Sequence, residues 1–277
     1  MAIKDLLKEF HVVLAESYTK DEITAIFYRL TEAFWNIKRI DVSLQPDIEE
    51  PDNRMKNALI DLVQHKPWQY ITGKTSFYGL SFRVNEHVLI PRPETEELVD
   101  WIIQDFKDRN RQLKILDIGT GSGAIAISLA KNLKNTEVTA LDISLEALKV
   151  AQQNADLNKV EINFIQADIL QDFDVSKYDI IVSNPPYVRE QEKALMQKNV
   201  LDYEPDHALF VPDDNALLFY KKIIELAQKA GRKQQVYFEI NEYLQPDLEK
   251  YLIKNQIKNY LFKKDFFGKW RMLSVIL

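Results

Sequence analysis

The sequence contains no cysteine, and histidine occurs only 4 times among its 277 residues. The lack of cysteine excludes disulfide bonds, thiolate nucleophiles and cysteine-ligated zinc or iron–sulfur sites, and it suits a reducing compartment. No apolar run reaches the roughly 18 residues that a membrane-spanning helix needs. The first ten residues, MAIKDLLKEF, contain acids and no small-residue cleavage site, unlike a secretion signal. We therefore expect a cytoplasmic protein with no membrane partner.

The overall composition is that of an ordinary globular protein, with 28% charged and 46% hydrophobic residues. The length suggests one large domain or two. The net charge of −6 is unevenly distributed, because residues 221–277 carry 12 Lys+Arg against 6 Asp+Glu. We interpret the positive charge of this C-terminal part as a set of solvated helix faces. The alternative is that it contacts an acidic partner or RNA.

Residues 1–75 are expected to form a small helical domain. AIKDLLKEFHVVL places apolar side chains, Phe10 and Val13 among them, on one stripe at helical spacing. A second helix is expected to begin at the capping box formed by Thr19 and Glu22. A third covers residues 53–66, with Val63 expected in the core. These stripes indicate the core of a bundle rather than a cofactor site.

Residues 76–90 are expected to form a β-hairpin that links two domains. The hydrophobic period changes to two in SFYGLSFRV, and HVLI follows a turn that we place at Asn85 and Glu86. A helix is then expected to begin near Pro93 in PRPETEELVDWIIQDF, because the helix dipole favours acids in the first turn.

From Leu113 onward, short apolar segments alternate with amphipathic ones. We expect strands at LKILDI, EVTALDI, INFIQAD, YDIIVS and QQVYFEI, with helices between them and two closing strands near YLFKKD and WRMLSVIL. This alternation is typical of an α/β domain whose mostly parallel sheet is covered by helices on both faces.

Glycine is scarce, yet 3 of the 7 glycines lie within LDIGTGSGAIA, at Gly119, Gly121 and Gly123. Glycine lets a strand turn sharply into a helix and lets bare backbone approach a ligand closely. The helix N-terminus then presents unpaired N–H groups to the ligand. Asp142 ends the next strand, where a carboxylate can accept both hydroxyls of a ribose. The pattern predicts a nucleotide-like ligand.

Polar side chains follow four consecutive strand ends, at Asp117, Asp142, Asp168 and Asn184. Ligands of open α/β sheets bind at that edge. The glycine spacing is one residue shorter than the dinucleotide pattern G-x-G-x-x-G. Three acids suit a ligand with positive or neutral character better than a pyrophosphate, and S-adenosylmethionine, with its sulfonium and ammonium groups, fits that requirement.

The strand YDIIVS runs directly into Asn184, Pro185, Pro186 and Tyr187. Proline ends a strand and restricts the residue before it, so this strand end is stiff. The Asn184 side-chain oxygen and the Pro185 carbonyl can each accept one N–H of a substrate NH₂ group, which stabilises charge as it develops on the nitrogen. Tyr187 offers a flat face to a planar amide.

LDIGTGSGAIA, LDIS, QADIL and SNPPYV, in this order, resemble the motifs of class I S-adenosylmethionine methyltransferases. Asn-Pro-Pro-Tyr narrows the resemblance to enzymes that methylate a planar nitrogen of a nucleobase amine or a glutamine amide. Residues 69–99 and EPDHALF at residues 204–210 are similar to signatures of the release-factor glutamine methyltransferases. One departure is visible: Ile169 and Leu170 follow QAD, where many relatives have an aromatic residue.

The resemblance implies a Rossmann-like methyltransferase domain at residues 91–277, with an antiparallel last strand. In the sequence it is preceded by a helical substrate-recognition domain at residues 1–75. It implies S-adenosylmethionine as cofactor and methyl transfer to the amide nitrogen (N5) of the Gly-Gly-Gln glutamine in peptide chain release factors. The residues implied for catalysis and substrate binding are Asn184, Pro185, Pro186 and Tyr187. Those implied for cofactor binding are Gly119, Thr120, Gly121, Ser122, Gly123, Asp142, Asp168, Ile169 and Asn184.

The residues alone leave other functions open. The alternative is an N6-adenine or N2-guanine methyltransferase acting on DNA or RNA, which the negative net charge and the lack of a dense Lys/Arg stripe disfavour. We expect a monomer without direct nucleic-acid contact.

Further expectations concern the PRPETE segment, the histidines and metal binding. In PRPETE, Arg92 or Thr95 either contacts the cofactor or belongs to a segment that simply begins a helix. No metal-ligand spacing occurs, so we expect no metal. The histidines are expected to lie away from the strand ends, in structural or surface positions: His11, His65, His87 and His207.

Overall fold

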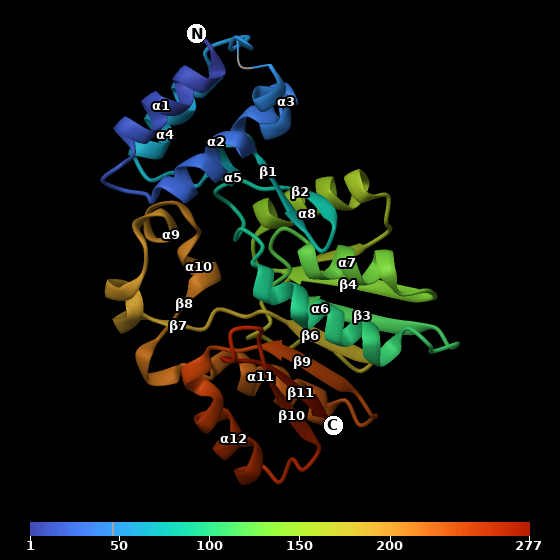
Figure 1. Cartoon of the computed structure of the whole chain (residues 1–277). Coiled ribbons are helices and arrows are strands. Elements are labelled where there is room, and N and C mark those ends of the chain that lie inside the picture. The colour runs from blue at the N-terminus through green and yellow to red at the C-terminus, as the bar shows by residue number, and fades with distance from the viewer. Residues whose placement is uncertain (46) are drawn as a thin grey trace. The chain divides into compact units, whose positions relative to one another are not determined.

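The computed structural model describes residues 1–45 and 47–277 and divides them into two compact units (Figure 1). The first comprises Met1–Lys74 together with Gln197–Tyr203, and the second comprises Thr75–Met196 together with Glu204–Leu277. The chain first passes from one unit to the other between Lys74 and Thr75. The short segment Gln197–Tyr203, however, belongs with the N-terminal helices although it lies far from them in the sequence.

The first unit is helical. Its elements are α1 (Ile3–Val13), α2 (Lys20–Trp35), α3 (Arg39–Leu44), α4 (Arg54–Val63), α5 (Trp68–Thr72) and α9 (Lys198–Tyr203). The expected capping box is present, since Glu22 N–H donates to the Thr19 hydroxyl at 3.3 Å and Thr19 N–H donates to Glu22 Oε2 at 2.8 Å. The Tyr203 hydroxyl donates to the Gln64 carbonyl at 3.0 Å, which ties α9 to the end of α4.

The core of this unit contains Phe10 and Phe27, whose rings meet edge to face at 5.0 Å. Val13 and Val63 were expected to lie inward as well, and this was wrong, because they are 46% and 49% exposed. Each is the last residue of its helix and adjoins a buried leucine, Leu14 or Leu62, so it lies beside the buried stripe and not in it.

The second unit is built on a seven-stranded sheet in the order β10-β11-β9-β6-β3-β4-β5. The strands are β3 (Leu113–Ile118), β4 (Thr136–Asp142), β5 (Asn163–Gln166), β6 (Ile180–Ser183), β9 (Gln235–Glu239), β10 (Tyr260–Lys264) and β11 (Trp270–Ile276). Strands β9, β6, β3, β4 and β5 pair in parallel, and β11 is antiparallel to both of its neighbours. The expected α/β fold with an antiparallel last strand is thus confirmed.

Helices cover both faces of this sheet (Figure 1). They are α6 (Pro93–Phe106), α7 (Ala124–Asn132) and α8 (Leu145–Asn158) in one core, and α11 (Leu218–Lys229) and α12 (Gln245–Lys254) in the other. Because successive strand residues face opposite sides, Ile115 packs in the first core and Leu116 in the second. Burial on both faces explains why these strands read as continuous apolar runs.

The hairpin consists of β1 (Lys74–Phe77) and β2 (Leu80–Arg83), and its turn differs from the expected one. The turn lies at Tyr78 and Gly79, not at Asn85–Glu86, and both turn residues have positive φ, at 48° and 73°. Consecutive positive φ angles match the twist of two short antiparallel strands, and glycine adopts them without strain. Residues 87–90 are not a strand.

Two segments after β6 complete the second unit. The chain passes through β7 (Val188–Arg189), η1 (Glu190–Leu195), α10 (Asp206–Leu209), β8 (Phe210–Val211) and η2 (Asp213–Asn215), and a further short helix, η3 (Glu242–Leu244), follows β9. β7 and β8 pair in parallel, with Val188 opposite Phe210. This pair joins the end of SNPPYV to the end of EPDHALF.

Candidate active site

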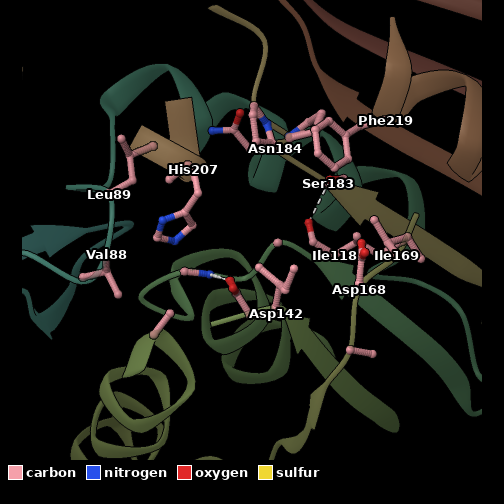
Figure 2. Close-up of a pocket in the computed structure, with 18 of the residues that line it drawn as sticks. Val88, Leu89, Ile118, Asp142, Asp168, Ile169, Ser183, Asn184, His207 and Phe219 are labelled. Carbon is pink, nitrogen blue, oxygen red and sulfur yellow. Dashed lines mark hydrogen bonds between the residues drawn. The ribbon is translucent and has the colours of Figure 1, made fainter. Parts of the chain in front are cut away.

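Three of the four predicted strand-end residues, Asp142, Asp168 and Asn184, lie around one cavity at the carboxyl edge of the sheet. The strand register places Ile118 of β3 beside Leu141 of β4 and beside Ser183 of β6, so these strands end at the same level. The cavity measures about 250 Å³, and Asp142, Asp168 and Asn184 border it from different sides (Figure 2). The edge predicted from the sequence is therefore a real concave site.

The glycine-rich turn forms one wall of this cavity. Gly119 and Gly121 line it, and both have positive φ, at 72° and 54°. The Gly119 and Thr120 N–H groups donate to the Leu141 carbonyl at 2.8 and 3.0 Å, which fixes the turn against β4. Bare backbone thus faces the cavity, as a closely bound ligand requires.

Three residues expected to bind the cofactor lie behind this wall. Among the described residues that line the cavity, Thr120, Ser122 and Gly123 are not found. The Thr120 hydroxyl donates to Asp117 Oδ2 at 2.6 Å, and the Ser122 carbonyl accepts from Asn154 Nδ2 at 2.9 Å. These hydrogen bonds hold the glycine-rich turn on the side that faces away from the cavity.

Asp117 belongs to the same support and is fully buried. Its Oδ2 also accepts from the Ala126 N–H at 3.1 Å, at the start of α7. Burial raises the pKa of Asp117 to about 7, the Thr120 and Ala126 hydrogen bonds oppose that rise, and the neighbouring charge of Asp142 adds to it. Asp117 therefore supports the turn and does not border the cavity.

Asp142 and Asp168 present carboxylates that local backbone groups hold in place. Asp142 accepts from the Gly121 N–H at 2.8 Å with one oxygen and from the Ser144 N–H at 2.9 Å with the other. Asp168 accepts from the Leu170 N–H at 2.9 Å, and Ile169 lines the cavity beside it. A carboxylate has about four acceptor positions, so each keeps capacity for ligand hydroxyl or amine groups.

The Asn184 side chain is held by a chain of hydrogen bonds that ends on a buried acid. Asn184 Nδ2 donates to Thr95 Oγ1 at 3.4 Å, and Thr95 Oγ1 donates to Glu239 Oε2 at 2.6 Å. Because the Thr95 proton is used on Glu239, the Thr95 oxygen can only accept from Asn184. The amide nitrogen of Asn184 is thereby directed to Thr95, and its oxygen is left for a ligand.

Tyr187 is anchored by the same acid. Its hydroxyl donates to Glu239 Oε1 at 3.1 Å, and the Tyr220 hydroxyl donates to the Glu239 backbone carbonyl at 3.1 Å. Burial raises the pKa of Tyr187 far above its usual value, and the charge of Glu239 raises it further, so this hydroxyl remains a donor. Burial also raises the pKa of Glu239, against the hydrogen bond from Thr95 and the charge of Arg271.

EPDHALF and PRPETE meet through an ion pair. The Arg92 guanidinium lies 2.6 Å from Glu204 Oε1, and the Glu204 side chain is almost completely buried. Three residues further on, His207 lines the cavity together with Ala208. In the structure Arg92 therefore pairs with Glu204 and Thr95 with Glu239, and neither residue is among those that line the cavity.

Sequence reasoning missed several residues at this site. His87 and His207 were expected away from the strand ends, and this was wrong, since both line the cavity with Val88 and Leu89. Their elements pack over the strand ends from distant parts of the sequence, which no local pattern reveals. Glu239 was also missed, although it ends strand β9 in the same way that Asp142 ends β4.

The described residues contain neither a metal-binding cluster nor a membrane-spanning helix. Within residues 1–45 and 47–277, no group of three or more His, Cys, Asp or Glu side chains is placed to hold a metal ion. In the same part of the chain, no helix has both the length and the apolar character needed to cross a membrane.

Comparisons with known proteins identify relatives in sequence and in fold. The family model "Methyltransferase small domain" matches residues 98–204. A release factor glutamine methyltransferase of Flavobacterium psychrophilum is 51% identical over 99% of both chains, and one of Bacteroides thetaiotaomicron is 42% identical over 94% of this chain and 95% of its own. A solved structure, a human methyltransferase 10 domain containing protein, shares the fold at 20% identity, with a TM-score of 0.52 over 72% of this chain and 90% of its own. This chain belongs to the family of the release factor glutamine methyltransferases.

Proposed function

We propose that this enzyme transfers a methyl group from S-adenosylmethionine to the side-chain amide nitrogen of the glutamine in the Gly-Gly-Gln motif of a peptide chain release factor. The observation that carries the proposal is the orientation of Asn184. Its amide nitrogen is bound through Thr95 to the buried Glu239, so its oxygen is available to a substrate NH₂ group at the rim of the cavity.

The cavity fits S-adenosylmethionine in charge. Its wall contains the carboxylates of Asp142 and Asp168, and no Lys or Arg is among its described lining residues. This suits a ligand that carries sulfonium and ammonium groups. In the proposed arrangement Asp142 accepts from the ribose hydroxyls, Gly119 and Gly121 bring bare backbone to the ligand, and Asp168 with Ile169 borders the adenine.

Thr120, Ser122 and Gly123 have an indirect role in this proposal. They shape the turn from behind, through Asp117 and Asn154, and place Gly119 and Gly121 against the ligand. Asn184 borders both the cofactor cavity and the proposed substrate position.

Amide nitrogen is a poor nucleophile because its lone pair is delocalised into the carbonyl group. The Asn184 oxygen and the Pro185 carbonyl each accept one N–H of the substrate NH₂, which localises the lone pair and orients it at a reacting distance of about 3 Å. Positive charge that develops on the nitrogen is stabilised where it forms. S-adenosylmethionine, which Asp142, Gly119 and Gly121 would hold, would supply the methyl group from its sulfonium and would be left as a neutral thioether.

The methylated nitrogen then loses one proton to water, so no side chain of this protein needs to act as a general base. Pro185 and Pro186 hold the two acceptors in fixed directions. Tyr187, whose hydroxyl is bound by Glu239, gives the planar amide a fixed ring face to pack against.

We also propose a role for each domain, a cellular location and an oligomeric state. Residues 1–75 act as the substrate-recognition domain, residues 76–90 as a linker and residues 91–277 as the methyltransferase domain. The enzyme works in the cytoplasm as a monomer, without direct contact to membranes or nucleic acid. The lack of cysteine and the net charge of −6 support this part.

A labelling experiment tests the function. The protein is incubated with methyl-labelled S-adenosylmethionine and, in separate reactions, an intact release factor, the same factor with the Gly-Gly-Gln glutamine replaced by alanine, and RNA or DNA. We expect label on the intact factor alone. Label on nucleic acid, or equal label on the alanine variant of the factor, would contradict the proposal.

A further inference from the structure

Two adjacent aromatic side chains project into solvent from the loop between β10 and β11. Phe266 is 93% exposed and Phe267 is 79% exposed. Exposed apolar residues are ordinary when they occur singly, but two neighbouring rings leave a large apolar surface in water. Large aromatic side chains also supply much of the binding energy at protein interfaces.

The loop that carries these rings is held in one conformation by a buried carboxylate. Asp265 accepts from the Phe267 N–H at 3.0 Å, from the Lys269 N–H at 2.9 Å and from Arg271 Nε at 3.1 Å. The Asp265 N–H donates to the Lys269 carbonyl at 2.8 Å. A fixed loop loses little conformational entropy on binding, so the rings are presented ready for a partner.

This loop lies at the same edge of the sheet as the proposed reaction site. The Phe266 N–H donates to Glu97 Oε1 at 3.1 Å, and Glu97 is the fifth residue of α6. Thr95, which accepts from Asn184, lies on the same helix two residues before Glu97. In the sheet, Met272 of β11 lies opposite Glu239 of β9, so the loop before β11 is at the same edge as the strand ends.

The surface beside the rings is acidic. A hollow of about 570 Å³ lies between this loop and α6, and its lining residues include five acids, which are Glu94, Glu96, Glu97, Asp100 and Asp105. Two lysines also line it. Lys263 Nζ lies 3.9 Å from the Trp101 ring centroid, and Lys264 Nζ lies 4.8 Å from that of Trp270. A complementary partner has apolar side chains flanked by Lys or Arg.

We propose that Phe266 and Phe267, with the acidic face of α6, form a docking surface for the protein substrate itself. The inference rests on the proposed function. A glutamine side chain is short, so the protein that inserts it beside Asn184 must also cover the neighbouring rim. The rings and acids of this rim then bind an apolar, basic patch of the release factor outside its Gly-Gly-Gln motif.

Steady-state kinetics with an intact release factor test this surface. We expect the double variant F266A/F267A to raise KM for the factor at least about tenfold, with kcat within about twofold of wild type, because the rings bind substrate and do not touch the reacting atoms. The double variant F266Y/F267Y retains the rings and should keep KM within about threefold. The matched control is I253A, which removes another side chain exposed at 63%, on α12.

Cofactor affinity, measured by calorimetry, and melting temperature show whether the variants remain intact, and both should match wild type. A KM within twofold of wild type in F266A/F267A, or an equal increase in I253A, would overturn the proposal. So would a wild-type dimer that F266A/F267A converts to a monomer with unchanged KM, because the rings would then cover a second copy of this chain. If wild-type enzyme does not methylate the factor at all, the proposed function fails instead.

Discussion

At the scale of single residues, Glu239 links two side chains of the SNPPYV strand end. One of its oxygens accepts from Thr95, which in turn binds Asn184, and the other accepts from Tyr187. A carboxylate can accept on both sides at once, whereas a glutamine amide has only one acceptor oxygen. Glu239 is therefore a positioning residue for both parts of the proposed substrate site.

We expect E239Q to lower kcat by about 10- to 100-fold, because Asn184 or Tyr187 loses its fixed orientation. Cofactor affinity should remain near that of wild type, since Glu239 is not among the cavity-lining residues. The pair T95V and T95S supplies the control, because serine keeps the hydroxyl and valine does not. Wild-type kcat in both E239Q and T95V would contradict the positioning role.

Asp117 gives a pH dependence whose sign follows from its environment. Burial raises its pKa to about 7 in the folded protein, from 3.8 in the unfolded chain. The stabilisation that protonation of Asp117 brings is full below about pH 4 and is lost as the pH rises to about 7. Between these limits the free energy of unfolding should fall by up to about 1.4 kcal/mol per pH unit from this group.

We expect D117N to flatten this slope, because the variant has no proton to lose at this position. Urea unfolding of both proteins between pH 5 and pH 8 measures the difference, and subtraction removes the contributions of the shared histidines. Parallel curves for D117N and wild type would show that Asp117 titrates as an ordinary exposed acid.

At the scale of elements, the turn from β3 into α7 depends on close packing at Gly123. A Cβ atom at this position would lie 2.9 Å from Ile127 Cδ1 and 3.2 Å from the Ala151 Cβ, and φ is +81°. Because Gly123 has no side chain, α7 and α8 can pack closely at this point. Gly123 is also the N-cap residue of α7. The packing at Gly123 thereby helps to position Gly119 and Gly121 at the wall of the cavity.

We expect G123A to lower the free energy of unfolding by about 1–3 kcal/mol, from the strained φ and the crowded Cβ together. G231A is the matched control, because φ there is +67° but no atom lies within 4 Å of the added Cβ. The control should cost about 1 kcal/mol. Urea unfolding checks both, and an equal loss in the two variants would mean that packing at Gly123 contributes nothing.

The strands and the hairpin turn differ in how well the sequence predicts them. Parallel strands buried on both faces, such as β4 and β6, have an unmistakable apolar pattern, so the strand ends at Asp142 and Asn184 could be placed without coordinates. The same reasoning applied to QQVYFEI would have identified Glu239. The hairpin turn was misplaced because Asn85–Glu86 is polar, whereas the positive φ of Gly79 and Tyr78 determines where the chain reverses.

At the scale of the whole molecule, chain order does not determine which parts pack together. Gln197–Tyr203 belongs to the N-terminal unit although the residues on either side of it belong to the other unit. The pairing of Arg92 with Glu204 likewise joins residues 112 positions apart. No periodicity or motif carries such information, so these contacts and the cavity positions of His87 and His207 required the structure.

The proposed mechanism depends most on the Asn184 oxygen as a fixed acceptor for the substrate amide. The most direct measurement is the single-turnover rate of methyl transfer to an intact release factor by N184A, with cofactor affinity measured in parallel. We expect the rate to fall at least about 100-fold while cofactor affinity stays within a few fold of wild type. A near wild-type rate in N184A, with methylation still on the same glutamine by mass spectrometry, would contradict the mechanism.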